Sequence, residues 1–174
     1  GASINIQIDD DMPLANGNSH TIQEGSSVAP MEVLLMLDLS LSMNSNVGGG
    51  QARLDVAQAA LVNLVNAYGN ASNNVTFRFM TFNNDVTDRG TYTNANIATL
   101  IALIQGFTEA QEPGGSLYPE TDYQDAVVAM QNVVNAWDAG NGSTKLVYFM
   151  SDGVPQSGGG DTVTINNALE TSWK

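Results

Sequence analysis

The chain has 174 residues, of which 43% are hydrophobic, so it can form one domain with a buried core, and global disorder is excluded. Its 18 acidic and 5 basic side chains give a net charge of −13, which disfavours nucleic acid and anionic membranes as partners and favours divalent cations. The absence of cysteine excludes disulfides and thiolate metal sites, and no apolar run reaches the roughly 18 residues that membrane insertion as a helix requires.

The first 30 residues differ in pattern from the rest of the chain. Residues 3–8 alternate polar and apolar side chains, which is typical of a half-buried strand. The run Asp9–Asp11 ends this strand, and a stretch rich in Gly, Asn and Ser follows. We interpret residues 1–30 as the end of a preceding module with an extended linker or strand, and residues 31–174 as the main domain.

From residue 31 onward, apolar strands alternate with amphipathic helices. The wholly apolar run at 33–37 predicts a strand that is buried on both faces of a parallel sheet. A helix is predicted after the loop Gly48–Gly50, with its end at Gly69 and Asn70. Its expected buried stripe is formed by side chains three or four positions apart, namely Leu54, Ala57, Leu61, Leu64, Val65 and Tyr68.

The second half of the chain continues the alternation. The predicted elements are, in order, a strand at 75–82, an antiparallel edge strand at 86–92, a helix at 95–104, an irregular loop at 109–120, a helix with Thr121 as its N-cap, and a further buried strand at 145–150. This order predicts an α/β fold, a doubly wound, mostly parallel sheet flanked by helices on both faces, as in Rossmann-like proteins.

Hydroxyl and carboxylate side chains gather where the predicted strands end. Asp38, Ser40 and Ser42 alternate after the first strand, so an extended loop would turn all three toward one side. Thr121 and Asp152 are expected at the same edge of the sheet. Such a set of oxygen ligands, without His or Cys, favours Mg²⁺, Mn²⁺ or Ca²⁺ over zinc or copper. If one of the two carboxylates acts through water, the ion keeps an open position, and a carboxylate from a partner protein or peptide would fill it and complete the neutralisation.

Four ordered segments carry a family resemblance. They are Met36-Leu37-Asp38-Leu39-Ser40-Leu41-Ser42-Met43, the run Arg53 to Ala60, Thr121 followed by Ala126-Val127, and the run Val147 to Gly153. Together they resemble the metal-ion-dependent adhesion site (MIDAS) of von Willebrand factor A (VWA) domains. The resemblance implies that Ser40, Ser42 and Thr121 are direct metal ligands, and that Asp38 and Asp152 bind directly or through water.

The chain departs from this family pattern in two respects. Glu120 stands before the threonine, where family members often have glycine, and an added carboxylate there would raise metal affinity, favour Ca²⁺ or repel an acidic ligand. The family fold normally continues beyond the strand that precedes Asp152, so the domain is expected to be truncated at its C-terminus, without the last strand–helix units.

The N-terminal segment is similar to the junctions between repeats of giant bacterial adhesins of the repeats-in-toxin (RTX) type. This resemblance implies Ca²⁺ bound by Asp9, Asp10 and Asp11, neighbouring adhesin repeats as partners, and type I secretion to an extracellular, cell-surface location. The same run of aspartates is also compatible with a solvated turn.

Three functions fit the residues. The first is a metal-dependent module that binds an acidic group of a partner, as in adhesion, and we take it as the leading hypothesis, with no enzymatic activity. The second is a structural spacer whose metal only stabilises the fold. The third is a metal-dependent phosphohydrolase. Two observations argue against it: Ser40 stands where such enzymes typically have a second aspartate, and the one histidine, His20, lies in the linker.

Overall fold

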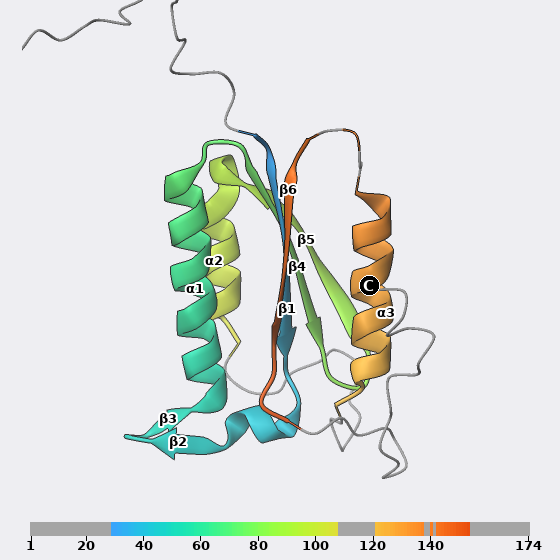
Figure 1. Cartoon of the computed structure of the whole chain (residues 1–174). Helices are drawn as coiled ribbons and strands as arrows, with labels where there is room; N and C mark the ends of the chain where they lie inside the picture. The colour runs from blue at the N-terminus through green and yellow to red at the C-terminus, as the bar shows by residue number, and fades with distance from the viewer. Residues whose placement is uncertain (1–28, 108–120, 138–139, 141, 154–174) are drawn as a thin grey trace, which may run out of the picture.

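The computed structural model describes residues 29–107, 121–137, 140 and 142–153, which form a central sheet with helices on both faces (Figure 1). The elements are β1 (Met31–Asp38), the 3-10 helix η1 (Leu41–Asn44), β2 (Asn46–Gly48), β3 (Gln51–Ala52), α1 (Arg53–Ala71), β4 (Val75–Phe82), β5 (Val86–Thr93), the 3-10 helix η2 (Asn94–Asn96), α2 (Ile97–Gln105), α3 (Tyr123–Ala136) and β6 (Thr144–Met150). The predicted N-terminal strand, the linker and the loop at 109–120 lie outside the described residues.

The sheet has the strand order β5-β4-β1-β6. Strand β1 pairs in parallel with both β4 and β6, whereas β5 pairs antiparallel with β4 at one edge. The register brings Asp38 beside Phe82 and Leu37 beside Met150, so the carboxyl ends of the three parallel strands lie level with one another. The predicted α/β architecture, with an antiparallel edge strand, is confirmed.

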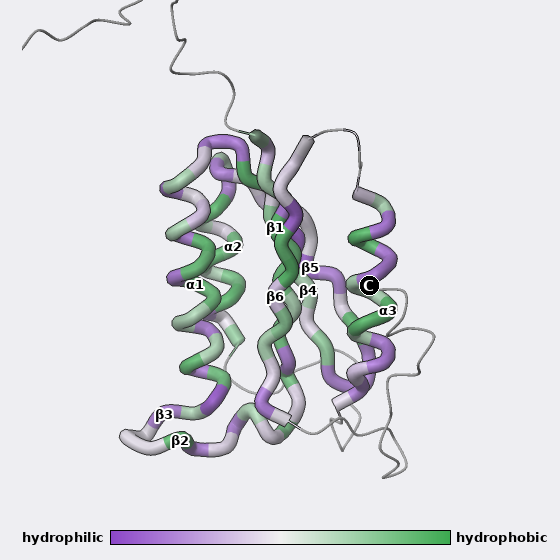
Figure 2. The backbone as a smooth tube through the Cα atoms, viewed as in Figure 1, coloured by the Kyte–Doolittle hydropathy of each residue, from purple (hydrophilic) through white to green (hydrophobic). Residues whose placement is uncertain are grey.

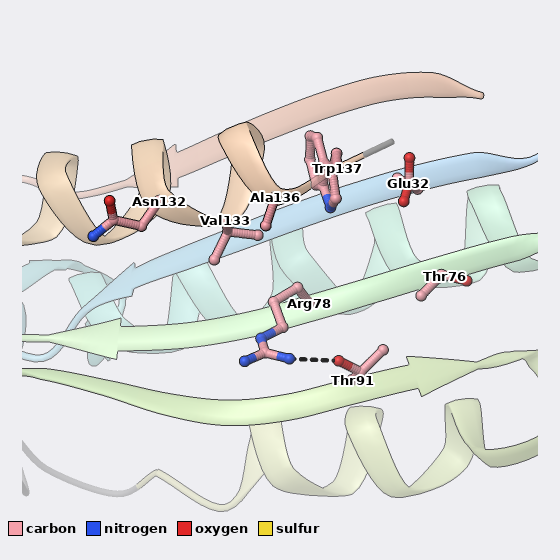
Figure 3. Close-up of a pocket in the computed structure, with 8 residues that line it drawn as sticks. All are labelled: Glu32, Thr76, Arg78, Thr91, Asn132, Val133, Ala136 and Trp137. Carbon is pink, nitrogen blue, oxygen red and sulfur yellow. Dashed lines mark hydrogen bonds between the residues drawn. The ribbon is translucent and has the colours of Figure 1, made fainter. Parts of the chain in front are cut away.

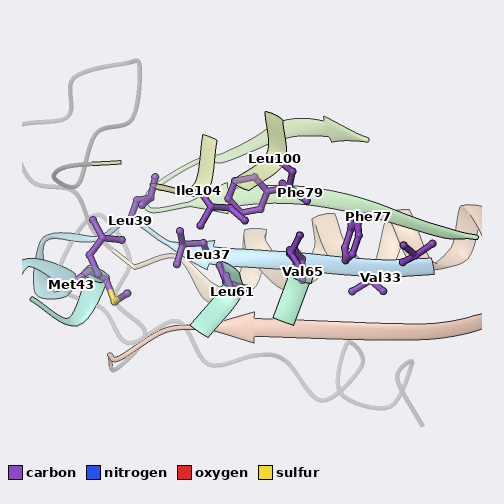
Figure 4. Close-up of a cluster of buried hydrophobic side chains, with 13 residues drawn as sticks. Val33, Leu37, Leu39, Met43, Leu61, Val65, Phe77, Phe79, Leu100 and Ile104 are labelled. Carbon is purple, nitrogen blue, oxygen red and sulfur yellow. The ribbon is translucent and has the colours of Figure 1, made fainter. Parts of the chain in front are cut away.

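The residues of β1 alternate between two cores, as expected for a central strand whose two faces are both covered. Val33, Leu35 and Leu37 pack in the cluster beneath α1 and α2, part of which is drawn in Figure 4. Leu34 and Met36 pack in a smaller cluster with α3 on the opposite face. Figure 2 shows β1 as a largely hydrophobic strand between these layers. None of the described helices combines the length and the apolar character needed to cross a bilayer.

The prediction that the strand at 145–150 is buried is wrong for the described residues. Strand β6 lies at the edge of the described sheet and has β1 as its one neighbour there. Each of its residues is at least partly exposed, and Val147 is 37% exposed. The apolar run does form a strand, as predicted. Its burial, however, depends on which elements pack beside it.

The predicted end of the first long helix is also wrong. Helix α1 continues through Gly69 and Asn70 to Ala71. A Cβ atom at Gly69 would lie 2.4 Å from the Cδ1 atom of Ile97 in α2, so this glycine permits a close approach of the two helices. Gly69 therefore lies within the helix and allows α2 to pack closely against it, whereas the sequence pattern indicated that the helix ends there.

The start of α3 differs by one residue from the prediction. Asp122, and not Thr121, is the N-cap, and its side chain accepts a hydrogen bond of 3.1 Å from the backbone N–H of Asp125. The backbone N–H of Asp122 donates to the carbonyl of Asn83, 2.8 Å away, which ties this segment to the end of β4. Thr121 is left outside the helix, with its side chain at the edge of the sheet where β1 ends.

Candidate functional site

Three segments that are distant in sequence meet at the carboxyl ends of the parallel strands. Asp38 is the last residue of β1, and Asp152 lies two residues beyond the end of β6. The Thr121 segment reaches the same edge through the hydrogen bond between Asp122 and Asn83. The structure thus brings together all five residues that the sequence analysis singled out as ligands in this domain core, namely Asp38, Ser40, Ser42, Thr121 and Asp152.

The loop after β1 folds back on itself. The backbone N–H of Ser40 donates to Oδ1 of Asp38 over 2.7 Å, and the hydroxyls of Ser40 and Ser42 are 3.0 Å apart. The loop is not extended throughout, as its alternation suggested, because Leu41–Asn44 form the 3-10 helix η1. The backbone N–H of Met43 accordingly donates to the carbonyl of Ser40, and the two serine hydroxyls still reach one another.

Asp152 joins this loop to the end of β6. Its Oδ1 atom accepts a hydrogen bond of 2.8 Å from the hydroxyl of Ser42. Its Oδ2 atom forms a salt bridge with Nη1 of Arg53, the first residue of α1. Both oxygens of the carboxylate are therefore engaged, one by a hydroxyl and one by a guanidinium.

Two residues outside the predicted set hold Asp38 and the end of β6 in place. The hydroxyl of Ser151 donates to Oδ2 of Asp38 over 2.5 Å. The Tyr123 hydroxyl lies 2.5 Å from the Ser151 hydroxyl and donates to the carbonyl of Gly153 over 2.7 Å. The Tyr123 ring packs against Phe82 and Phe149, so a residue of α3 fixes the loop after β6.

Thr121 is placed by its contact with Gly153. The threonine is buried, with 6% of its surface exposed. A Cβ atom at Gly153 would lie 3.5 Å from the Ser42 hydroxyl oxygen and 4.0 Å from the Thr121 hydroxyl oxygen. The two hydroxyls therefore border one small space beside Gly153, which the missing side chain leaves open.

Burial dominates the electrostatics of Asp38. The residue is fully buried, and the loss of hydration raises the pKa of its carboxyl above the ordinary value of 3.8. Hydrogen bonds from Ser151 and Ser40 act in the opposite direction, and the charge of Asp152 raises the pKa further. Burial also raises the pKa of the neighbouring Tyr123 hydroxyl. A cation at this place would favour the ionised form of Asp38.

The donor set fits a hard divalent cation. It contains two carboxylates and three hydroxyls, all oxygen, which suits Mg²⁺, Mn²⁺ or Ca²⁺. Within the described part of the chain, no three His, Cys, Asp or Glu side chains cluster in a way that would hold a metal, so an ion here must rely on the hydroxyls. The space beside Gly153, bordered by Ser42 and Thr121, agrees with such a site. The role of these residues as metal ligands stays a prediction.

The other predicted ligand positions lie outside the described residues. These are Glu120, Asp9, Asp10 and Asp11, so both the added carboxylate beside Thr121 and the N-terminal Ca²⁺ junction stay predictions.

A pocket of about 420 Å³ lies away from this edge, between α3 and strands β4 and β5 (Figure 3). Glu32 and Thr76, at the amino ends of β1 and β4, are among its lining residues. Arg78 donates to the Thr91 hydroxyl there over 2.8 Å and forms a salt bridge with Asp88. The pocket is thus at the opposite end of the strands from Asp38.

Sequence reasoning missed three residues of the site: Arg53, Tyr123 and Ser151. Ser151 had a local signal, since it is a hydroxyl residue between a strand end and Asp152. Arg53 and Tyr123 had none, because their positions depend on how α1 and α3 pack against the sheet.

Solved structures with a similar fold include several pilus proteins. The PilB minor pilin from Streptococcus sanguinis aligns with a TM-score of 0.60 and 17% identity over 74% of this chain and 31% of that one. The vWF domain of the type V pili tip protein Mfa5 from Porphyromonas gingivalis aligns with a TM-score of 0.55 and 23% identity over 73% of this chain and 39% of that one. The pilus adhesin RrgA from Streptococcus pneumoniae aligns with a TM-score of 0.56 and 21% identity over 74% of this chain and 21% of that one. The chain spans less than half the length of each of these proteins.

At these identities the likeness establishes the fold alone. No curated protein sequence matches the chain. A family model for the von Willebrand factor type A domain matches residues 33–154, a span that contains all five residues of the site and all of the parallel strands except the first two residues of β1. This match covers more than half of the chain, and the chain therefore belongs to the von Willebrand factor type A domain family.

Proposed function

We propose that this domain is a metal-dependent adhesion module that binds an acidic group of a partner protein through a divalent cation. The single observation that carries the proposal is the hydrogen bond between Ser42 and Asp152, which joins the loop after β1 to the loop after β6 around Asp38 and Thr121. Asp38, Ser40, Ser42, Thr121 and Asp152 would hold the ion. When bound, the ion would act as an electrophile toward a carboxylate of the partner.

The charges at the site favour binding over tight sequestration of the ion. Only two carboxylates face it, and Arg53 neutralises part of the charge of Asp152. Three neutral hydroxyls contribute oxygen atoms without charge. A divalent ion held in this way keeps a net positive charge, which a carboxylate from another molecule would neutralise.

The relatives of the fold support a role at the cell surface. PilB is a minor pilin, RrgA is a pilus adhesin and Mfa5 is a pilus tip protein. We propose by analogy that the present domain belongs to a bacterial surface protein and has an adhesive, non-enzymatic role. Its origin in an RTX adhesin, type I secretion and Ca²⁺ at Asp9–Asp11 depend on residues outside the described part, and are proposed on their sequence resemblance alone.

A peptide-display selection tests the proposal without a known partner. Random peptides selected on the immobilised protein in Mg²⁺ and eluted with EDTA are expected to be rich in Asp and Glu. Binding of the selected peptides should disappear when their acidic residue is changed to Asn or Gln. The S42A variant should not bind them, whereas S45A, which alters an exposed serine of the same loop, should bind as the wild type does.

Two results would reject the proposal. The first is equal binding of the selected peptides in EDTA, and the second is binding that survives the S42A substitution. Turnover of generic phosphoesters in Mg²⁺, abolished by D38A, would instead support the phosphohydrolase hypothesis.

A further inference from the structure

Arg53 contributes a fixed positive charge to the edge of the candidate site. It is the first residue of α1, and its Nη1 atom contacts Oδ2 of Asp152. The Arg53 side chain is 41% exposed, whereas the Asp152 side chain is 11% exposed. The guanidinium of Arg53 thus places a positive charge directly beside the Asp152 carboxylate.

The backbone around Arg53 is held firmly. Its N–H donates to the carbonyl of Ser45 over 3.0 Å, which ties the start of α1 to the loop that carries Ser40 and Ser42. The N–H of Ala52 donates to the carboxylate of Asp55 over 2.8 Å. Arg53 is therefore presented to Asp152 by the same loop that supplies the hydroxyls of the site.

Both oxygens of Asp152 are already engaged, by Ser42 and by Arg53. A cation can still bind directly to this carboxylate, because each oxygen keeps a second lone pair, or it can interact with Asp152 through water. In either case the guanidinium competes with the ion for the charge of Asp152, and it also repels the ion.

We infer that Arg53 is a positioning residue that restrains Asp152 and thereby lowers the affinity of the site for its metal. This inference rests on the proposed metal site and adds an internal competitor to it. By keeping Asp152 partly neutralised, Arg53 leaves the bound ion with more unsatisfied positive charge for the carboxylate of a partner. Arg53 would thus weaken the binding of the metal and strengthen the binding of the partner's carboxylate to the metal.

Calorimetric titration of the protein with Mn²⁺ alone, after removal of metal, tests the inference. R53Q is expected to bind Mn²⁺ about two- to five-fold more tightly than the wild type, a modest gain because one member of the salt bridge is largely exposed. R53K should fall between the two, since lysine keeps the charge without the planar fork. In the D152N background, R53Q should raise the Mn²⁺ affinity less than it does in the wild type, because only the repulsion between the guanidinium and the ion is then removed.

R78Q is the matched control. It removes one positive charge and breaks the Arg78–Asp88 salt bridge, which lies on β4 and β5 and not at the site. Any gain in R53Q beyond that of R78Q is then local. Equal or weaker Mn²⁺ binding by R53Q, with the wild type still binding, would overturn the role of Arg53 alone. A wild-type protein that binds no Mn²⁺ would overturn the metal site together with this role.

Discussion

The hydroxyl of Ser42 donates a hydrogen bond of 2.8 Å to the carboxylate of Asp152, although 110 residues separate them in the chain. The parallel pairing of β1 with β6 explains this contact, because it sets Leu37 beside Met150 and lets both loops emerge at the same level. The sheet register therefore places the two loops side by side, and the hydrogen bond between Ser42 and Asp152 joins them.

The Thr121 hydroxyl offers the simplest test of the ligand set. In T121V the shape of the buried side chain is kept and the hydroxyl is lost. We expect the affinity for Mg²⁺, measured by calorimetry, to fall by an order of magnitude or more, since even residues one shell further out commonly change metal affinity by about 10- to 100-fold. T121S, which keeps the hydroxyl, should retain most of the affinity. Unchanged Mg²⁺ binding in T121V would remove Thr121 from the ligand set.

Gly153 is expected to keep open the space that the ion needs. A Cβ atom there would make ordinary van der Waals contacts with the Ser42 and Thr121 hydroxyls, at 3.5 and 4.0 Å, so G153A should fold. The added methyl group would nevertheless occupy the space between these two hydroxyls. The melting temperature of G153A in EDTA should stay close to that of the wild type, and Mg²⁺ should no longer raise it. A normal Mg²⁺-dependent rise would show that the ion does not lie beside Gly153.

The buried carboxyl of Asp38 predicts a stability that depends on pH. Since burial raises its pKa above 3.8, the folded state favours the neutral form. The stability that this group contributes is complete below pH 3.8 and is lost as the pH rises through the raised pKa of the folded state. In EDTA, the neutral variant D38N should therefore melt at a higher temperature than the wild type at pH 7.

The difference between D38N and the wild type should shrink as the pH is lowered toward 4. Mg²⁺ at pH 7 should reverse the order, because it stabilises only the protein that can bind it. A D38N variant that is less stable than the wild type in EDTA at pH 7 would contradict the claim that burial destabilises the ionised form of Asp38.

Tyr123 is expected to act through the loop after β6. Y123F keeps the ring contacts with Phe82 and Phe149 but loses the hydroxyl that donates to the Gly153 carbonyl and lies beside the Ser151 hydroxyl. We predict a loss of about 1 kcal/mol in the free energy of unfolding, measured with urea, and a few-fold weaker affinity for Mg²⁺. Y92F, which loses a hydrogen bond of 2.7 Å to the carbonyl of Arg89, is the control for stability alone. Equal Mg²⁺ affinities in the two variants would mean that Tyr123 does not position the site.

The sequence predicted the fold well where local pattern and burial agree. The apolar run of β1 indicated a strand covered on both faces, and the polar residues after it pointed to the functional edge of the sheet. Pattern alone was less reliable where tertiary contacts decide. Gly69 suggested a helix end, but it accommodates Ile97, and β6 was expected to be buried but lies at the edge of the described sheet.

The partners of the site depend on packing and could not be predicted. Thr121 and Asp122 are both good N-cap residues, and it is the Asp122 side chain that accepts the hydrogen bond from the N–H of Asp125. Arg53 lies near Asp152 because its backbone N–H is hydrogen-bonded to Ser45 in the segment that follows β1. No spacing rule in the sequence encodes that contact.

The most direct test of the central claim is the anomalous diffraction of a crystal grown or soaked in Mn²⁺. The account predicts one strong peak within about 2.5 Å of the hydroxyl oxygens of Ser40, Ser42 and Thr121, a distance typical of direct coordination by oxygen. No peak at this edge of the sheet, or a peak on another part of the surface, would contradict it.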